Sequence, residues 1–388
     1  MLFMKKEKKG LVLLCLSYAL YYVTLGVYSP FLNIYYERIG LNGFQIGLIS
    51  SCGLLMAMLI SPLWGALTDR KNQYKRMIAF LMLSTALIGL IWKQQQVFLW
   101  VFVLSLLLNI FRSNIGNLYD GFSIQFCKEN QFEYSLIRSM GSLGYLVGAF
   151  LIGNLMFEVF KIQGPYMIVL SAVSVFAIVL LYFVKDPIFP QVSQETNNLK
   201  NNLKELLKNK DYLLILILCF FSIHAFDSAN GYMGNHLVAT LHFPDSSIGL
   251  VTCAMVLPEI LIVMKIHVLL KKLGLKKAFL IATVAQVIRC IIYATSSTLP
   301  MIILASVVHG IMIGVGTVGV VSYIHEKVPS YMLATAMSVY GAFTVISYAI
   351  QAQLFGIIYQ QFGSHMIFIL TALFSCVAFL IAAKTKRL

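Results

Sequence analysis

The sequence predicts an all-α integral membrane protein with twelve transmembrane helices in two pseudo-symmetric six-helix bundles. Three observations lead to this fold class: the amino-acid composition, a series of long apolar runs, and the distribution of positive charge. Of the 388 residues, 59% are hydrophobic and only 11% are charged, whereas a soluble domain carries about 25% charged residues. A soluble fold of this length could not cover its surface with so few charges.

Twelve apolar runs are long enough to cross a bilayer as helices, since a spanning helix needs about 20 residues. They occupy residues 11–36, 44–67, 77–93, 97–122, 135–158, 164–184, 212–240, 246–270, 276–296, 299–325, 330–359 and 364–384. Several runs exceed the minimum length, so tilted or kinked helices are expected. Because the runs are continuously apolar instead of alternating, long β-barrel strands are excluded.

The positions of Lys and Arg agree with this assignment. Cytoplasmic loops of membrane proteins carry an excess of Lys and Arg, and an even number of spans places both termini on one side. The segments on that side hold 23 of the 29 Lys and Arg residues, and the opposite side holds only Arg38, Lys93 and Lys161. The sequence therefore predicts a multi-pass protein of the cytoplasmic (inner) membrane, with both termini in the cytoplasm.

One connection is longer and more polar than the others. Residues 185–211 follow the sixth span and read KDPIFPQVSQETNNLKNNLKELLKNKD. The other loops are short, so this segment divides the chain into two halves. We expect an N-terminal six-helix bundle at 1–184, a cytoplasmic linker at 185–211 and a C-terminal six-helix bundle at 212–388.

A motif lies between the second and third spans, where Gly65, Asp69 and Arg70 are followed by a basic cluster. It resembles the signature loop of the major facilitator superfamily. There the Asp can accept from helix N-terminal amides and the Arg can pair with a neighbouring helix. The usual Gly after Asp-Arg is absent, and the corresponding loop at 271–277 keeps only the basic part. The alternative is a basic cytoplasmic loop with an accidental Asp-Arg.

Further segments narrow the resemblance. Residues 26–31 (GVYSPF), residues 138–148 (RSMGSLGYLVG) and the set Glu259, Arg289 and His309 are similar to lactose permease and the 3-phenylpropionate permease. The chain thus resembles the oligosaccharide/proton symporter and phenylpropionate permease branch of the superfamily. The resemblance implies a monomeric secondary active transporter that moves a small polar solute, above all a sugar or oligosaccharide, by alternating access with proton symport.

Ionisable residues also occur near the middle of several spans. Charged groups in the bilayer core cost several kcal/mol each, so they are rare and usually functional. They are Arg112 in span four, His224 and Asp227 in span seven, Glu259 in span eight, Arg289 in span nine and His309 in span ten. Groups of both signs on different helices predict a shared polar cavity, in which transporters bind substrate. We expect Arg112, His224 and Asp227 to contribute to substrate binding.

The set Glu259, Arg289 and His309 is the candidate for proton coupling. A carboxyl group in a low-dielectric site can hold a proton at neutral pH, a nearby Arg can displace that proton, and a His can donate or accept. Lactose permease has a second Glu one turn after the His, and here Met312 takes that position. The proton carrier would then be Glu259 or Asp227. The alternative is a permanent Glu259–Arg289 ion pair that only holds spans eight and nine together.

In the first half, the resemblance implies a substrate clamp. Asp120 and Arg138 align with the carboxylate and the arginine that hold the sugar in lactose permease, and Tyr145 replaces the tryptophan that stacks on the sugar ring. Tyr145 lies two turns after Arg138, roughly on the same face, and a Tyr can stack and also donate its hydroxyl. The alternative is that Asp120 and Arg138 only mark the ends of their helices at the membrane interface. Arg112 has no counterpart, and it would favour a carboxylate such as an aromatic acid over a neutral sugar.

Several other functions are disfavoured. The chain has no GxxxxGK[ST] phosphate loop for ATP and no HExxH or GxSxG motif, so we expect neither an ATP-driven pump nor an enzyme. Seven cysteines without CxxC spacing predict no metal site, and no cofactor is expected. The net charge of +14 reflects loop topology, not nucleic-acid binding. Transport of an aromatic acid or a nucleoside, by a uniporter or exporter without proton coupling, stays open. His236 and His242 are expected to face water or lipid headgroups.

Overall fold

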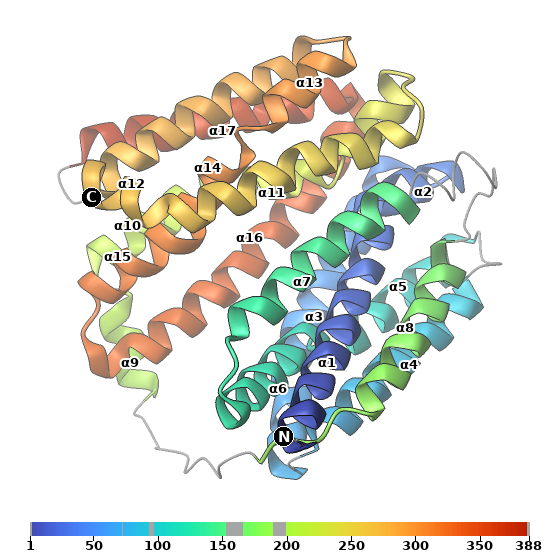
Figure 1. Ribbon diagram of the computed structural model, residues 1–388. Helices are drawn as coiled ribbons and strands as arrows, with labels where there is room; N and C mark the ends of the chain where they lie inside the picture. Colours follow the sequence, from blue (N-terminus) through green and yellow to red (C-terminus); the bar gives the residue numbers. More distant parts are fainter. Residues whose placement is uncertain (1, 72, 93–96, 153–165, 189–198, 386–388) are drawn as a thin grey trace. The chain divides into compact units, whose positions relative to one another are not determined.

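The computed structural model describes residues 2–71, 73–92, 97–152, 166–188 and 199–385, and all regular structure within these ranges is helical (Figure 1). The chain separates into two compact units. Unit 1 comprises Met1–Leu41 and Cys52–Ser193, and unit 2 comprises Asn42–Ser51 and Gln194–Leu388. The first turns of α3 (Gly43–Lys71) therefore belong to unit 2, where the Ser51 hydroxyl donates to the carbonyl of Ala349 at 2.7 Å.

Besides most of α3, the described part of unit 1 contains nine helical elements. They are α1 (Leu2–Tyr28), η1 (Ser29–Phe31), α2 (Leu32–Arg38), α4 (Tyr74–Trp92), α5 (Phe98–Arg112), α6 (Ile115–Asn130), α7 (Tyr134–Val147), η2 (Gly148–Ile152) and α8 (Tyr166–Tyr182). The first predicted span is interrupted by the tight turn η1 at Pro30, because proline supplies no backbone N–H for an α-helical bond. The fourth is interrupted at Ser113–Asn114, directly after Arg112.

Apart from the first turns of α3, the described part of unit 2 runs from α9 to α17. Its elements are α9 (Leu199–Leu206), α10 (Lys210–Cys219), η4 (Phe220–His224), α11 (Ala225–Asn230), η5 (Asn235–Thr240), α12 (Ser246–Thr295), α13 (Leu299–Ser306), α14 (His309–Gly314), η6 (Val315–Gly319), α15 (Val320–Lys327), η7 (Ser330–Met332), α16 (Leu333–Phe362) and α17 (Ser364–Lys384). The 50-residue α12 holds the eighth and ninth predicted spans, which meet at a bend where Gly274 has φ 74°. A left-handed φ of this kind favours glycine.

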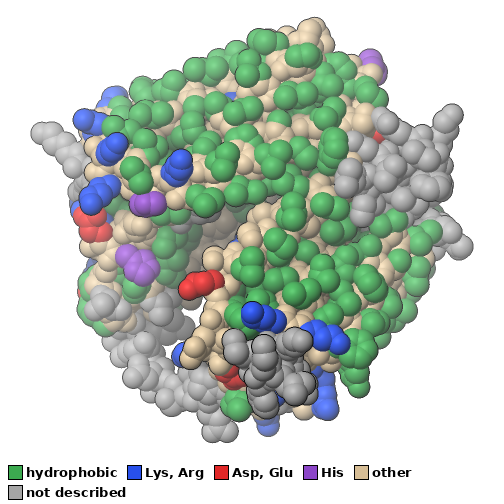
Figure 2. Space-filling model, viewed as in Figure 1, with side chains coloured by type: hydrophobic (Ala, Val, Ile, Leu, Met, Phe, Trp, Pro, Cys, Tyr) green, Lys and Arg blue, Asp and Glu red, His purple; other side chains and the backbone are tan. Residues whose placement is uncertain are grey.

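Eight helices in the described ranges are long and apolar enough to cross a membrane, and Ile168–Tyr182 and Leu299–Gly314 are shorter apolar helices. Large apolar side chains on these helices are exposed, such as Leu59, Leu261 and Leu304 at 62–67%. Figure 2 shows hydrophobic side chains over the visible helices and Lys and Arg near helix ends. Exposed apolar surface of this extent fits a lipid environment. Residues 153–158 of the fifth predicted span and residues 164–165 of the sixth lie outside the described residues.

The expected linker is not a simple loop. Within 185–211, residues 199–206 form α9, and α10 already begins at Lys210. The Asn209 side chain caps α10 by accepting from the amides of Asp211 and Tyr212 at 3.0 Å. The polar composition was therefore a poor guide to local structure in this segment, whose residues 189–198 lie outside the described ranges.

Glycines bring α1 and α7 together in unit 1. A methyl group on Gly144 would lie 2.2 Å from the carbonyl oxygen of Ala19, and one on Gly148 would lie 2.3 Å from that of Val23. Small residues at such positions let helix backbones approach closely. This packing places the tyrosine-rich face of α1 beside α7, where the candidate residues of unit 1 lie.

Two lysines make the same contact in the two units. Lys75 at the start of α4 donates to carbonyl oxygens 107 and 109 residues further on, at the end of α8. Lys276, after the bend in α12, donates to carbonyl oxygens 107 and 109 residues further on, at the end of α17. A cation at a helix C-terminus satisfies free carbonyls and is stabilising. The identical spacing shows that the contact between the third and sixth spans is repeated between the ninth and twelfth spans.

Candidate functional site

Unit 2 brings Glu259, Arg289 and His309 together. Glu259 and Arg289 lie on the two arms of α12, and His309 is the first residue of α14, after the chain turns between α13 and α14. The His309 Nδ1 atom is 2.9 Å from Arg289 Nη1, and its Nε2 atom is 3.5 Å from Glu259 Oε2. His309 is therefore the bridge between the arginine and the carboxylate. A direct Glu259–Arg289 ion pair was the alternative that the sequence left open, and in the structure the imidazole of His309 contacts both side chains.

The close approach of α14 to α12 depends on Gly310. A methyl group at this position would lie 2.4 Å from the Cα atom of Glu259. Because His309 precedes Gly310, the same approach places the imidazole beside the Glu259 side chain. The glycine next to His309 is thus part of the local packing that brings His309 to Glu259.

Hydrogen-bond chemistry fixes the protonation of His309 in this arrangement. A guanidinium has only donors, so Nδ1 of His309 accepts from Arg289. The imidazole proton is then on Nε2, which is directed at Glu259, and the 3.5 Å separation makes this a long contact. The three side chains form a relay in which Arg289 donates to His309 and His309 faces the Glu259 carboxylate.

Arg289 is almost fully buried, with 1% of its surface exposed. The centre of its guanidinium lies 3.4 Å from the centre of the Phe226 ring, a cation–π contact. Its Nε and Nη2 atoms have no hydrogen-bond partner in the part of the chain that the structure describes. A buried donor without a partner costs about 1–3 kcal/mol, and more if it is charged.

The polar residues of span seven form a neighbouring group. The Tyr348 hydroxyl donates to Asp227 Oδ2 at 2.8 Å. The His224 ring packs edge-on against the Tyr348 ring, with centroids 5.1 Å apart. His224 is 1% exposed, and neither imidazole nitrogen has a hydrogen-bond partner among the described residues. His224 and Asp227 thus share Tyr348 of α16 as a neighbour.

Asp120 in unit 1 is held by tyrosines. Its Oδ1 atom accepts from Tyr18 of α1 at 2.6 Å and from Tyr134 of α7 at 2.9 Å. The guanidinium of Arg138 lies 5.3 Å from the centre of the Tyr22 ring, which packs on Tyr18 with ring centroids 4.9 Å apart. The structure therefore connects Asp120 and Arg138 through a cluster of tyrosines on α1 and α7.

Tyr145 occupies α7 as expected, and its side chain is half-buried. Its backbone is pressed against α1, since a methyl group on Gly26 would lie 2.1 Å from the Tyr145 carbonyl oxygen. The glycine on α1 thereby fixes the height of Tyr145 along α1.

Arg112 lies at the end of α5, beside the interruption of the fourth span. Its guanidinium is 4.2 Å from the centre of the Tyr28 ring, next to the interruption of the first span. It also lines a small cavity of about 10 Å³ with Tyr21, Thr24, Met82, Thr85, Ile115, Leu170 and Ser174. This volume is about that of one water molecule, so the cavity as it stands holds no solute.

The signature residues lie in a helix, not in a loop. Gly65, Asp69 and Arg70 belong to the C-terminal turns of α3, which ends at Lys71. Asp69 accepts from the hydroxyl of Tyr74, at the start of α4, at 2.6 Å. The expectation that Asp69 would accept from helix N-terminal amides is not what the structure shows. The partner is instead a side chain across the short turn.

His236 also differs from its expectation. It is completely buried instead of facing water or headgroups. Its Nδ1 atom is 2.8 Å from the Ser364 hydroxyl, and its ring packs edge-on against His365 with centroids 5.1 Å apart. The π-helical turn η5 rotates His236 toward α17, which periodicity at 3.6 residues per turn could not anticipate.

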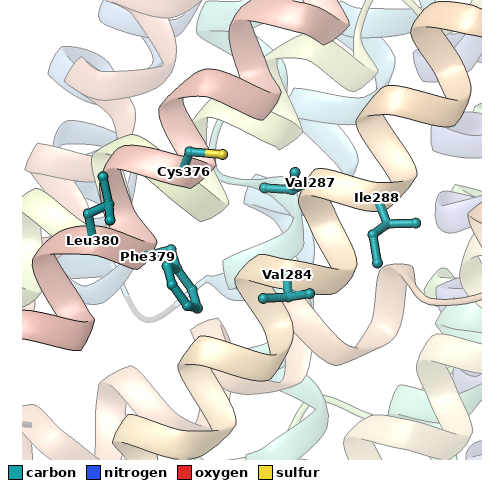
Figure 3. A pocket seen from close by; sticks show the side chains of 6 residues that line it. All are labelled: Val284, Val287, Ile288, Cys376, Phe379 and Leu380. Carbon is teal, nitrogen blue, oxygen red and sulfur yellow. The ribbon is translucent and has the colours of Figure 1, made fainter.

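One apolar pocket is lined by none of these residues. Its volume is about 260 Å³, and its lining residues are Val284, Val287, Ile288, Cys376, Phe379 and Leu380 of α12 and α17 (Figure 3). It offers a solute almost no polar atoms, so its lining suits a lipid acyl chain. No cluster of three His, Cys, Asp or Glu side chains that could hold a metal occurs in the described residues.

Sequence reasoning missed the aromatic partners of these charges. They are Tyr18, Tyr22 and Tyr134 in unit 1 and Phe226 and Tyr348 in unit 2. A signal was present, because Tyr18 and Tyr22 are four residues apart and share one helix face. The 20 tyrosines against three tryptophans are a second signal.

Comparison with known proteins identifies the family. The sequence matches the MFS_1 like family over residues 11–370. The maltose permease of Geobacillus stearothermophilus is 24% identical over 328 residues, which cover 84% of this chain and 82% of that protein. The probable 3-phenylpropionic acid transporter of Escherichia coli (strain K12) is 23% identical over 374 residues, which cover 96% of this chain and 97% of that protein.

A crystal structure of the nucleoside transporter NupG has a similar fold, with a TM-score of 0.84 at 17% identity, covering 97% of this chain and 100% of that one. The chain belongs to the MFS_1 like family and has the all-α major facilitator fold. It is accordingly a secondary transporter of the multi-pass membrane class and not an enzyme.

Proposed function

We propose that this member of the family imports a small polar solute together with protons across the cytoplasmic membrane by alternating access. The observation that carries the proposal is the buried relay of unit 2, in which His309 lies between Arg289 and Glu259. Buried ionisable groups in a spanning region are costly and mark ion pathways. A merely structural ion pair would need no intervening imidazole.

The relay has two arrangements that differ by one proton. With Glu259 ionised, its carboxylate faces the Nε2–H group of His309, and Arg289 supplies a positive charge behind the imidazole. With Glu259 protonated, its carboxyl group becomes a donor, and the group that faces Nε2–H of His309 is no longer negatively charged. Solute binding that favours one arrangement would therefore change proton affinity, which is the linkage that symport requires.

A sugar or oligosaccharide is the leading substrate class. The support lies in unit 1, where Asp120 offers carboxylate oxygens and the neighbouring tyrosines offer hydroxyls and aromatic faces. Carboxylates and aromatic rings are the groups that recognise sugar hydroxyls and sugar faces. In this proposal Asp120, Arg138 and Tyr145 bind the solute, and His224 and Asp227 contribute from unit 2.

An organic carboxylate is the second candidate substrate, favoured by Arg112. The described neighbours of its guanidinium are the Tyr28 ring and a hydroxyl-lined cavity. An arginine placed among aromatic and hydroxyl groups inside a span is suited to an anion.

The remaining parts of the proposal concern the whole protein. Both termini face the cytoplasm of a cell whose inner membrane holds the protein. Residues 1–184 and 212–388 form the two bundles, with 185–211 as the linker. The protein works as a monomer without a cofactor, and Gly65, Asp69 and Arg70 have a structural role at the turn between α3 and α4.

The test is solute-induced alkalinisation. Purified protein is reconstituted in vesicles, and sugars, nucleosides and organic acids are added one at a time while external pH is recorded. We expect one class to raise the external pH as protons enter with the solute. Uptake of a labelled solute with no pH change, and with no dependence on an imposed proton gradient, would instead establish a uniporter.

A further inference from the structure

The guanidinium of Arg289 can be contacted at its face, at Nη1 and along its Nε–Nη2 edge. In the structure the first two of these contacts are made. One face of the guanidinium lies on the Phe226 ring at 3.4 Å, which fixes its plane. The Nη1 atom is bonded to His309 at 2.9 Å, which fixes its rotation within that plane. The edge formed by Nε and Nη2 is the third of these, and both atoms lack a hydrogen-bond partner among the described residues.

This edge has a specific chemical complement. Two parallel N–H groups in one plane match the two oxygens of a carboxylate, and the pair makes a bidentate contact. Neutral groups such as sugar hydroxyls add no negative charge beside the buried guanidinium. A lysine in place of Arg289 would keep the positive charge but would not offer the planar pair of donors.

The described carboxylates near Arg289 do not hydrogen-bond to this edge. Asp227, the residue after Phe226, accepts from Tyr348 at 2.8 Å. Glu259 contacts His309. Met312, one turn after His309 on α14, is buried and carries no carboxylate. The edge is thus preformed and buried, and no described side chain uses its two donors.

We propose that the Nε–Nη2 edge of Arg289 is a carboxylate-binding subsite, so that the transported solute is an organic acid. The inference rests on the proposed transport function and deepens it, because it chooses the acidic substrate class over neutral sugars. A bound carboxylate would accept from Nε and Nη2 of Arg289, while Nη1 still donates to His309. The substrate and the relay would then both contact the same guanidinium.

The test compares matched ligands by direct binding. Purified protein is titrated with 3-phenylpropionate and 3-phenylpropionamide, and with glucuronate and glucose, and its thermal unfolding and heat of binding are recorded. We expect the acid of at least one pair to bind and its neutral partner to bind roughly tenfold or more weakly, because hydrogen bonds to charged groups are strong. Equal binding within both pairs, or no binding of either acid, would overturn the proposal.

Variants of Arg289 make the test specific to the edge. Arg289→Lys keeps the charge and so protects the fold, and it should lose roughly tenfold in affinity for the acid while the neutral ligand is unaffected. Arg289→Gln should remove the preference altogether, with size-exclusion chromatography reporting whether it is folded. Arg76→Lys, on the exposed start of α4, is the matched control and should bind as the unmodified protein does. An acid preference that survives in Arg289→Lys would also overturn the proposal.

Failure of the inference can be told apart from failure of the transport proposal. If glucose or another neutral sugar drives alkalinisation and neither acid binds, the carboxylate subsite is excluded and proton symport stands. If an acid binds through Arg289 but no solute changes the pH, the subsite stands and proton coupling is excluded.

Discussion

In the proposed symport, single side chains decide the coupling. Glu259 is 28% exposed on its side chain while His309 is 9% exposed, so the carboxylate is the member of the relay that water or solute can reach. Under the proposed symport, a proton that enters the relay would therefore reach Glu259 first. The imidazole of His309 connects Glu259 to Arg289.

Replacing Glu259 by Gln should separate coupling from binding. The amide keeps the shape but cannot titrate, so we expect uphill accumulation in a proton gradient to vanish while exchange of labelled solute at equal concentrations persists. Uptake into energised vesicles and counterflow measure the two activities. Glu326→Gln is the control, since Glu326 is exposed and pairs with its neighbour Lys327. Undiminished uphill uptake in Glu259→Gln would transfer the coupling role to Asp227.

Asp120 provides the second prediction at this scale. Asp120→Asn weakens the two tyrosine hydrogen bonds at 2.6 and 2.9 Å and removes the charge. If Asp120 binds the solute, affinity should fall roughly tenfold or more, with little change in thermal stability. Solute titration and thermal unfolding distinguish this from a helix-boundary role, which would lower stability and leave affinity unchanged. Glu133→Gln, an exposed carboxylate at the start of α7, is the control.

At the scale of helices, packing and end contacts matter more than individual polar groups. The α1–α7 pair depends on backbone approach at glycines, and the ends of α8 and α17 depend on lysines that donate to their last carbonyls. Neither feature requires a charge inside the bilayer. Both are therefore expected to affect stability and to leave substrate selectivity unchanged.

Gly144→Ala tests the helix contact. The added methyl group would lie 2.2 Å from the Ala19 carbonyl oxygen, so α1 and α7 must separate, at a cost of about 1–3 kcal/mol. We expect a lower unfolding temperature and a smaller folded yield, measured by thermal unfolding and size-exclusion chromatography. Gly341→Ala is the matched control, because nothing lies within 4 Å of its added methyl group. Equal stability of the two variants would contradict the close contact.

The lysine contacts give a paired prediction. Lys75→Met and Lys276→Met each remove a donor from the end of a helix while keeping an apolar stem, and each should cost about 0.5–1 kcal/mol. Because the two contacts lie in separate units and share no partner, their effects on the free energy of unfolding should add in the double variant. Denaturant titration of the four proteins measures this. A double variant no less stable than either single variant would argue against two independent contacts.

On the scale of the whole molecule, the sequence was informative about what the membrane dictates. Long apolar runs and an all-helical fold follow from the need to satisfy every backbone group within lipid, and the charges of Glu259, Arg289 and His309 stood out because lipid makes them rare. The sequence did not predict which side chains contact one another. That His309 bridges Arg289 and Glu259, and that Tyr18 and Tyr134 hold Asp120, depends on interruptions at Ser113–Asn114 and Val307–Val308 that periodicity does not encode.

Orientation in the membrane is the last prediction. The lysines around the bend at Gly274 and those at the ends of the chain all fall on the side that the charge distribution assigns to the cytoplasm. Translocating such a cluster is disfavoured, so both termini should stay inside. A C-terminal alkaline phosphatase, which is active only outside the cytoplasm, should be silent, and green fluorescent protein at the same position should fluoresce. A phosphatase fused after Thr298, between α12 and α13, should be active as the positive control. Phosphatase activity at the C-terminus would reverse the orientation and, with it, the assignment of Lys75 and Lys276 to the cytoplasmic ends of their helices.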